Sequence, residues 1–205
     1  TATAVNSAED EGDSITRIYA LNRVKYAVGN QGAFAALKTD GAVVTWGGAE
    51  FGGDSRAVAD QLMNVQSIAA TTRAFSAIKS DGSVVTWGLS TYGGDSSAVA
   101  DQLTNVQFIT AANRAFAAIK ADGSVVTWGD PTYGGNSSAV SDQLTEVQSI
   151  TASANGAFAA LKADGSVVTW GYANRGGDSS AVSDQLTNVQ SISATASAFA
   201  AIKAD

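Results

Sequence analysis

Hydrophobic positions in this chain recur with a spacing of 41 residues. Phenylalanine and tryptophan show the period most clearly, and the step lengthens once, to 42 residues. A fixed period of this size is typical of repeat proteins, in which each unit buries its apolar faces against its neighbours. We therefore expect one continuous array. The residues that carry the period are Trp46, Trp87, Trp128 and Trp170, with Phe34, Phe75, Phe116, Phe158 and Phe199.

Each period contains two apolar runs separated by an Asp-Gly pair. In the third unit the runs are 115–120 and 124–129, Asp122-Gly123 stands between them, and a further run, 106–110, precedes both. An Asp-Gly pair in this setting predicts a β-hairpin with a type I′ turn, in which both central residues have positive φ. The two runs are thus expected to be antiparallel strands, which argues against a parallel β-helix. The other copies of the pair are Asp40-Gly41, Asp81-Gly82 and Asp164-Gly165.

Both faces of these expected strands are largely apolar. Alternation places Phe116 and Ala118 on one face of a strand and Ala117 and Ile119 on the other. A sheet covered on one side only would alternate more regularly with polar residues. Each hairpin is therefore expected to lie between similar hairpins, as in stacked propeller blades or a stacked β array. The tryptophans are expected to fill the space between the sheets.

The rest of each period predicts a short helix. Asn136 follows two glycines and precedes Ser137, which is typical of a helix N-cap. Val140 and Leu144 have i,i+4 spacing, so one face of the helix can press on the sheets. Lysines at the end of the second strand, such as Lys120, are expected at the solvent-exposed sheet edge near the turn aspartate. Asp54, Asp95 and Asp178 occupy the position of Asn136 in the other units.

The period divides the whole chain, and five periods account for its 205 residues. We expect a single repeat domain, 1–205, with repeats at approximately 7–47, 48–88, 89–129, 130–171 and 172–205. Residues 1–6 fall where a third strand is expected, whereas the last unit stops before its own third strand. These two ends, 1–6 and 189–205, are predicted to form one split repeat. The predicted closure residues are Thr1, Ala2, Thr3, Ala4 and Val5 on one side and Phe199, Ala201 and Lys203 on the other.

Three arrangements satisfy this split repeat. The N-terminal strand can close a five-bladed β-propeller within one chain. It can instead complete the next copy in a head-to-tail filament with strand exchange, because a heterologous contact that does not close grows without limit. The chain can also be part of a longer open stacked array. In all three the fold is mainly β, built from antiparallel hairpin strands and short helices.

Composition excludes several function classes. The formal net charge is −7, and the basic residues are spread along the period, so a nucleic-acid-binding surface is not expected. Cysteine and histidine are absent, which excludes disulfides, thiolate nucleophiles and imidazole bases. No run reaches the roughly 20 apolar residues of a membrane-spanning helix. The low-charge composition, rich in Gly, Ala, Ser, Thr and Asp, favours a secreted or cell-surface protein.

The residue before each Gly-Gly pair is the best candidate for ligand binding. It lies in the segment that differs most among the copies, and variable loops on a regular scaffold commonly carry recognition. A row of aromatic rings there can hold a glycan, with one site per repeat, or a protein partner; equally, the rings can simply cover the helix or the loop. The candidate residues are Phe51, Tyr92, Tyr133 and Arg175, which stand before Gly-Gly, and Tyr172, which opens the variable segment of its copy.

Metal-dependent and catalytic functions are not expected. The recurring aspartates match no calcium-loop spacing, and helix capping explains the first set more simply. A catalytic site is usually a single asymmetric constellation, whereas nearly every acidic position here recurs several times. We therefore expect no cofactor, no metal and no enzymatic activity.

The stretch Ala-Phe-Ala-Ala-Ile-Lys-Ala-Asp-Gly-Ser-Val-Val-Thr-Trp-Gly at 115–129 resembles repeats of the regulator of chromosome condensation family, especially the short, near-identical repeats of bacterial and protist proteins. The resemblance recurs in four full units and covers most of the chain. It implies a β-propeller that contacts proteins, lipids or chromatin, but no single activity. The unit is shorter than the family's, whose propeller commonly has seven blades, and Gly-Gly-Asp-Ser-Ser-Ala-Val stands where the family often has Gly-Gln-Leu-Gly. Nucleotide-exchange activity is therefore not carried over.

The sequence thus predicts a non-catalytic repeat scaffold for protein–protein interaction or self-assembly, placed outside the cell or on its surface. Its partners would be another protein or further copies of itself. A glycan-binding lectin is the alternative, and a repeat-built hydrolase is a distant third.

Overall fold

The computed structural model describes residues 23–204, which form a mainly β, β-propeller-like repeat fold. Within these residues four sheets have three antiparallel strands and the fifth has two. The sheets are β1 (Val24–Gly29), β2 (Ala33–Lys38) and β3 (Val43–Gly47); β4 (Val65–Ala70), β5 (Ala74–Lys79) and β6 (Val84–Gly88); β7 (Val106–Ala111), β8 (Ala115–Lys120) and β9 (Val125–Gly129); β10 (Val147–Ala152), β11 (Ala157–Lys162) and β12 (Val167–Gly171); and β13 (Val189–Ala194) with β14 (Phe199–Lys203).

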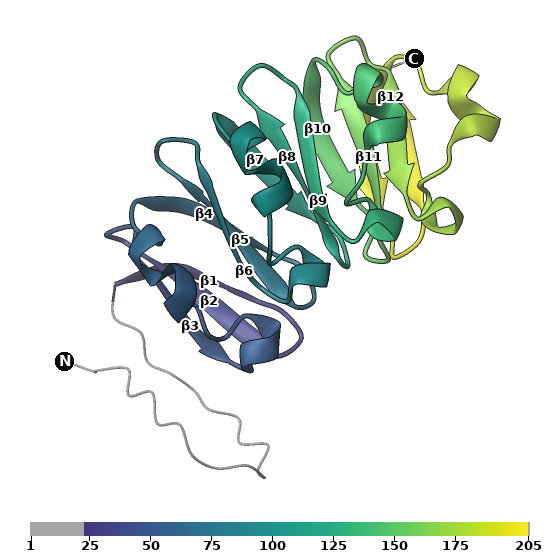
Figure 1. Ribbon diagram of the computed structural model, residues 1–205. Coiled ribbons are helices and arrows are strands. Elements are labelled where there is room, and N and C mark those ends of the chain that lie inside the picture. The colour runs from purple at the N-terminus through teal and green to yellow at the C-terminus, as the bar shows by residue number, and fades with distance from the viewer. Residues whose placement is uncertain (1–22, 205) are drawn as a thin grey trace.

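The sheets stack face to face in chain order. Figure 1 shows them as an arc, with β1–β3 and β13–β14 at its two opposite ends. Hydrogen bonds between the loops hold adjacent sheets in register: Thr72 N–H donates to Asn113 O (3.1 Å), and Asn155 N–H donates to Ala196 O (2.9 Å). The predicted closure strand, Thr1–Val5, lies outside the described residues, whereas its predicted partners Phe199, Ala201 and Lys203 form the last strand, β14.

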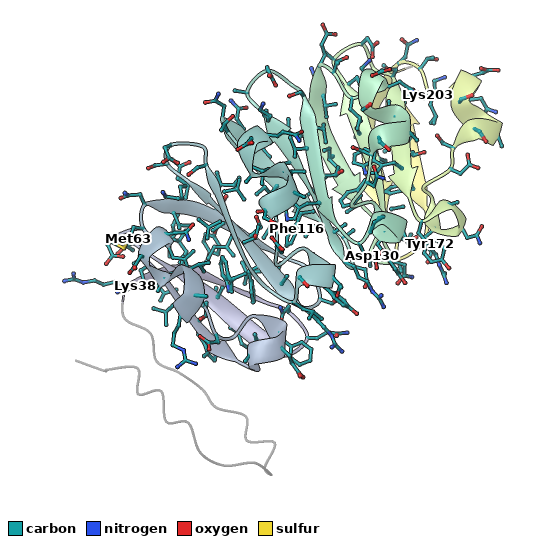
Figure 2. The ribbon with its side chains drawn as sticks, viewed as in Figure 1. Lys38, Met63, Phe116, Asp130, Tyr172 and Lys203 are labelled. Atoms are coloured by element: carbon teal, nitrogen blue, oxygen red, sulfur yellow. The ribbon has the colours of Figure 1, made fainter. Side chains whose placement is uncertain are left out.

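The space between two sheets is filled by a Phe–Trp pair from one sheet and small or aliphatic residues from the previous one. Phe116 on β8 is fully buried and its ring stacks on Trp128 of β9, with centroids 5.2 Å apart. The indole Nε1 donates to the carbonyl oxygen of Gly93, in the loop that follows the preceding sheet (3.1 Å). Figure 2 shows Phe116 between the sheets. This confirms the expected core position of the internal tryptophans; Trp87 and Trp170 bond Gly52 and Gly134 in the same way.

The Asp-Gly hairpins are present, but the predicted type I′ turn is wrong. Lys79 and Ser83 flank a three-residue loop, Ser80-Asp81-Gly82, in which only Gly82 has positive φ (+76°). Asp81 keeps a negative φ because its carboxylate accepts hydrogen bonds from Ser83 N–H (2.9 Å) and Ser83 Oγ–H (2.6 Å). A turn followed by a left-handed glycine is the common three-residue hairpin.

The predicted helix is present as a two-turn 3₁₀ helix. In the fourth repeat it spans Ser138–Gln143, with Val140 half-buried and Leu144, just after its end, buried. Asn136 Oδ1 accepts from Ser138 N–H (2.9 Å), so the side chain caps the helix from one position earlier than expected. The equivalent helices are η2 (Arg56–Gln61), η4 (Ser97–Gln102), η6 (Ser138–Gln143) and η8 (Ser180–Gln185).

The turn edge of the arc carries the lysines. Lys38 and Lys79 each lie 3.7 Å from the aspartate two residues later, Asp40 and Asp81, and those carboxylates are mostly exposed. Hydrogen bonds from Ser83 and the nearby Lys79 lower the pKa of Asp81 below its usual value. In Figure 2, Lys38 and Lys203 lie toward this edge, and Asp130 and Tyr172 toward the opposite one.

Candidate functional site

The edge opposite the Asp-Gly turns carries the predicted ligand-binding residues. Each variable segment forms a single 3₁₀ turn, followed by a left-handed glycine; Phe51, Tyr92, Tyr133 and Arg175 end these turns, and Tyr172 directly precedes the last one. In the fourth repeat Asp130 caps this turn by accepting from Thr132 N–H (2.9 Å), and Pro131 occupies its first position. These turns are η1 (Ala49–Phe51), η3 (Ser90–Tyr92), η5 (Pro131–Tyr133) and η7 (Ala173–Arg175).

The aromatic rings at this edge alternate with arginines. Arg73 lies over the rings of Phe51 and Tyr92, with distances of 4.9 and 5.5 Å from its guanidinium carbon to the ring centroids. Arg114 lies over Tyr92 (4.8 Å) and Tyr133 (4.6 Å) in the same manner. We call these five residues, Phe51, Arg73, Tyr92, Arg114 and Tyr133, the rim ladder. The ladder runs through three successive repeats.

The ring faces stabilise the guanidinium charges of Arg73 and Arg114, which have few other partners. The Nε atoms of Arg73 and Arg114 are buried and make no hydrogen bond within the described part of the chain. Arg114 also faces the Asp130 carboxylate at 3.7 Å. A guanidinium held over aromatic faces gains about 0.5–2 kcal/mol per contact. The ladder is therefore a surface on which aromatic rings and guanidinium groups alternate.

The ladder ends in the fourth repeat. Gly156 replaces the arginine there, and Tyr133 packs directly over it, so that a Cβ on Gly156 would collide with the Tyr133 ring. Tyr172 meets Tyr133 edge to face, with centroids 5.6 Å apart, and Arg175 lies 5.9 Å from the centroid of Tyr172. The one-residue insertion lies in this same loop, because Ser153 N–H bonds Ala157 O whereas Thr71 N–H bonds Ala74 O.

All five predicted binding residues thus lie at one edge, and four of them are half-buried while Arg175 is exposed. Sequence reasoning missed Arg73 and Arg114, which cover the tyrosine faces. The sequence did contain a signal for them. Arg73 shares a repeat with Phe51 and Arg114 shares one with Tyr92, and each arginine stands directly before the Ala-Phe that begins a second strand. The prediction treated the aromatic rings as open to a ligand, but guanidinium groups cover part of their faces.

The two ends of the arc differ from its interior. At the first sheet Phe34 is 47% exposed, whereas its three internal equivalents Phe75, Phe116 and Phe158 are fully buried. Val44, on the same face, is half-buried, although Val85, Val126 and Val168 are buried. The first sheet therefore presents the face that every later sheet packs against its predecessor.

The last sheet presents the complementary face. Ile202 is 59% exposed and Ala198 and Ala200 are exposed. The equivalent residues inside the arc, such as Ala115, Ala117 and Ile119, are buried under the Phe–Trp pair of the next sheet. We call the two surfaces the Phe34 face and the Ile202 face. Each is one half of an interface that the interior of the chain forms repeatedly.

The described residues contain no cluster of three or more Asp or Glu side chains able to hold a metal ion. Among the same residues, no helix is long and apolar enough to cross a membrane.

No family model matches the chain, and no curated protein sequence matches it significantly. Several solved structures do. One is Prp20p from Saccharomyces cerevisiae, a protein with binding properties toward Gsp1p and histones. It is 14% identical, with a TM-score of 0.59 over 89% of this chain and 56% of that one. Yeast RCC1 (Prp20), solved with Kap60, gives 15% identity and a TM-score of 0.60 over 92% and 56% of the two chains.

Human WBSCR16 is 19% identical with a TM-score of 0.52, over 76% of this chain and 49% of that one. The chain spans about half the length of these proteins. At such low identity the comparison establishes the fold: the repeats of this chain form a β-propeller-like array similar to that of RCC1.

Proposed function

We propose that this chain is a non-catalytic scaffold that works through protein–protein contacts and associates head to tail with further copies of itself. The observation that carries the proposal is the pair of unlike terminal faces. Phe34 and its neighbours are the counterpart of Phe75, Phe116 and Phe158, and Ile202 is the counterpart of Leu37, Ile78, Ile119 and Leu161. A second copy can therefore add its first sheet to the last sheet of this one.

Hydrogen bonds fix the register of such a contact. Inside the arc, Gln31 N–H donates to Thr72 O, and the same bond recurs from Thr72 to Asn113 and from Asn155 to Ala196. Ala196 of one copy would donate in turn to Gln31 of the next. Because this contact joins two different surfaces, it is heterologous, and it builds either a closed ring or an open filament.

The expected affinity is modest. Phe34 and Ile202 are 47% and 59% exposed, so burying the rest of each side chain would contribute about half of the roughly 1.5–3 kcal/mol of a full burial. Association loses several kcal/mol of translational and rotational freedom, so two anchors give a concentration-dependent equilibrium rather than a permanent complex. Burial of the half-buried Val44 and the hydrogen bonds between the loops would also favour association.

Sedimentation velocity over a wide range of protein concentration tests this proposal. The sedimentation coefficient of the wild-type chain should rise with concentration, and Ile202→Glu should abolish the rise. Phe108→Glu is the matched control, because Phe108 is 62% exposed on β7 and lies in the interior of the arc. Equal loss of association in both variants, or a wild-type chain that stays monomeric, would contradict the proposal.

Glycan binding is the second candidate. Beside the rim ladder a cavity of about 370 Å³ lies between two repeats and is lined by Ser90, Thr91, Asp95, Gly129, Asp130 and Pro131. Hydroxyl and carboxylate groups can hydrogen-bond sugar hydroxyls, but Arg114 covers faces of Tyr92 and Tyr133 that a sugar ring would need. A glycan array probed with the wild type and with Asp95→Ala tests this function. Hits that persist in the variant would remove the cavity as the site.

A location outside the cell or on its surface belongs to the same proposal and rests on composition alone. Surface-restricted proteolysis of intact source cells tests it. Cleavage of the chain only after lysis would reject this location.

A further inference from the structure

The rim ladder interrupts the regularity of the repeats. Its two arginines occupy the same position in consecutive repeats, directly before the Ala-Phe of a second strand. The equivalent residues in the repeats on either side are Gly32 and Gly156. A Cβ on Gly32 would collide with the ring of Phe51, and a Cβ on Gly156 with the ring of Tyr133. The pair of arginines is therefore a local feature, confined to the interior of the described chain.

Both guanidinium groups have hydrogen-bond donors to spare. The side chain of Arg73 lies over the rings of Phe51 and Tyr92 and makes no hydrogen bond and no ion pair with another described residue. The Arg114 side chain has one charged neighbour, Asp130, at 3.7 Å, and remains 36% exposed. Both groups are thus within reach of a partner in solution.

The rings determine the direction from which a ligand can approach. A guanidinium group has five N–H donors in one plane. Arg114 lies between the rings of Tyr92 and Tyr133, which cover the faces of that plane and leave its edge. A carboxylate binds arginine through this edge, by two parallel N–H···O bonds. The geometry therefore favours carboxylates as ligands.

Hydrogen bonds hold the ring-bearing turns in place. Asn30 Nδ2 donates to Phe51 O (2.8 Å), and Thr71 Oγ1 donates to Tyr92 O (2.8 Å). Thr71 is buried, and its Oγ1 also accepts from Ala74 N–H (3.1 Å), so the turn that carries Tyr92 is tied to the first residue of β5. A surface that is ordered before binding loses less conformational freedom when a ligand binds.

The spacing of the arginines sets the period of a ligand. Arg73 and Arg114 lie over the same ring, Tyr92, at 5.5 and 4.8 Å, and belong to adjacent sheets. Sheets packed face to face lie about 10 Å apart. A polyproline II segment has three residues per turn and rises about 3.1 Å per residue, so every third side chain lies on one face, about 9 Å from the last. In a β-strand the side chains of one face recur about every 6.8 Å, which fits less well.

We propose that the rim ladder binds an acidic, proline-rich segment of a partner protein in the polyproline II conformation, with a carboxylate at every third residue. One carboxylate would bind Arg73 and the next Arg114. The prolines between them would pack on the half-buried rings of Phe51, Tyr92 and Tyr133. Arginine clusters that bind acidic motifs and aromatic surfaces that bind proline-rich segments are both recurring modes of peptide recognition. The ladder combines the two in one row.

This inference rests on the proposed scaffold function, because it names the class of partner for a protein–protein contact. It does not depend on self-association. The ladder lies at the loop edge of the arc, whereas the Phe34 and Ile202 faces lie at its two ends (Figure 1). Ile202→Glu should therefore bind the acidic segment like the wild type.

Fluorescence anisotropy with the full chain and a labelled peptide of three consecutive Glu-Pro-Pro units tests the proposal. The wild-type chain should show saturable binding with one site per chain. A peptide of three Gln-Pro-Pro units keeps the conformation without the charges and should bind at least about tenfold more weakly, because hydrogen bonds to charged groups are lost. A peptide of the same composition with its three glutamates adjacent keeps the charge but not the spacing, and should bind several-fold more weakly.

A pair of chain variants locates the site. Arg73→Gln removes a guanidinium of the ladder and should weaken binding of the Glu-Pro-Pro peptide at least about tenfold. Lys120→Gln is the matched control, because it removes the same charge at the opposite edge, at the end of β8, and should bind like the wild type. Thermal melts of both variants report folding. The comparison of peptides on the wild-type chain needs no variant, so it tests the proposal even where Arg73→Gln destabilises the fold.

Three results would overturn the assignment. These are the absence of Glu-Pro-Pro peptide binding in both the wild type and Ile202→Glu, equal binding of either control peptide, and equal weakening by Arg73→Gln and Lys120→Gln. A wild-type chain that stays monomeric yet binds the peptide with the expected preferences would reject head-to-tail association and support the assignment.

Discussion

The interior interfaces and the two terminal faces of this chain are built from nearly the same residues, yet their environments differ completely. Phe116 is fully buried, and Phe34, in the same sequence context, is 47% exposed. Ile119 is 5% exposed and Ile202 is 59% exposed. The comparison teaches that burial in this fold is a property of the contact between sheets and not of the single repeat, as expected for a quasi-one-dimensional array.

The largest expected difference concerns these phenylalanines. Phe116→Ala should lower the free energy of unfolding by about 3–5 kcal/mol, because it opens a cavity in a packed interface. Phe34→Ala should lower it by less than about 1.5 kcal/mol, since half of that ring is already in water. Urea unfolding followed by tryptophan fluorescence measures both. Similar losses in the two variants would show that the first sheet is packed like the others.

A smaller loss is expected from the indole hydrogen bond. Trp128→Phe leaves the buried carbonyl oxygen of Gly93 without its donor, which costs about 1–3 kcal/mol. Trp170→Phe should cost the same amount, because the Nε1–Gly134 bond has the same length, 3.1 Å. The same unfolding experiment checks this equality, and a strong asymmetry would mean that the interior interfaces are not equivalent.

The rim ladder should contribute less still. Arg114→Ala removes a guanidinium from between two tyrosine rings and should destabilise the chain by about 1–2 kcal/mol. Arg175→Ala is the control: it is exposed, lies over a single ring and should change stability by less than about 0.5 kcal/mol. Equal changes in stability for the two variants would show that the contacts of Arg114 with the tyrosine rings do not stabilise the fold.

The smallest effect concerns acid. Hydrogen bonds from Arg56 lower the pKa of Asp54 to about 2. A carboxyl group whose pKa is lowered on folding stabilises the native state above its unfolded pKa, about 3.9, and this stabilisation is lost as the pH falls through about 2. The Tm of Asp54→Asn should therefore lie below that of the wild type at pH 5 and converge with it near pH 2.

Asp60→Asn, in helix η2 that follows Asp54, removes the same charge and serves as the control for net charge. A Tm gap for Asp54→Asn that stays constant from pH 5 to pH 2 would contradict the assigned ion pair.

Much of the fold follows from sequence because the period is nearly perfect. Spacing alone predicts the hairpins, the buried Trp128 and the position of the helix near Val140. The turn type was predicted wrongly, because dipeptide preference ignores the hydrogen bonds from Ser83 that hold Asp81 at negative φ. Local side-chain bonding of this kind competes with the backbone preference of the pair.

The candidate surfaces were predicted less completely. The aromatic edge was found from the variability of its loops, but the arginines over Tyr92 come from other loops, in two different repeats. Arg73 and Arg114 each lie one residue before the second strand of a sheet, β5 or β8, and their contact with the rings depends on the spacing between stacked sheets, which the sequence of one repeat does not contain.

The most direct test of the account mixes two variants, each with one terminal face blocked. Phe34→Glu retains a working Ile202 face, and Ile202→Glu retains a working Phe34 face. By sedimentation velocity each variant alone should remain monomeric at concentrations where the wild type associates, and an equimolar mixture should form one-to-one dimers that grow no further. Dimers or larger species in either variant alone, or no complex in the mixture, would contradict the central claim that the terminal faces are two halves of the interior interface.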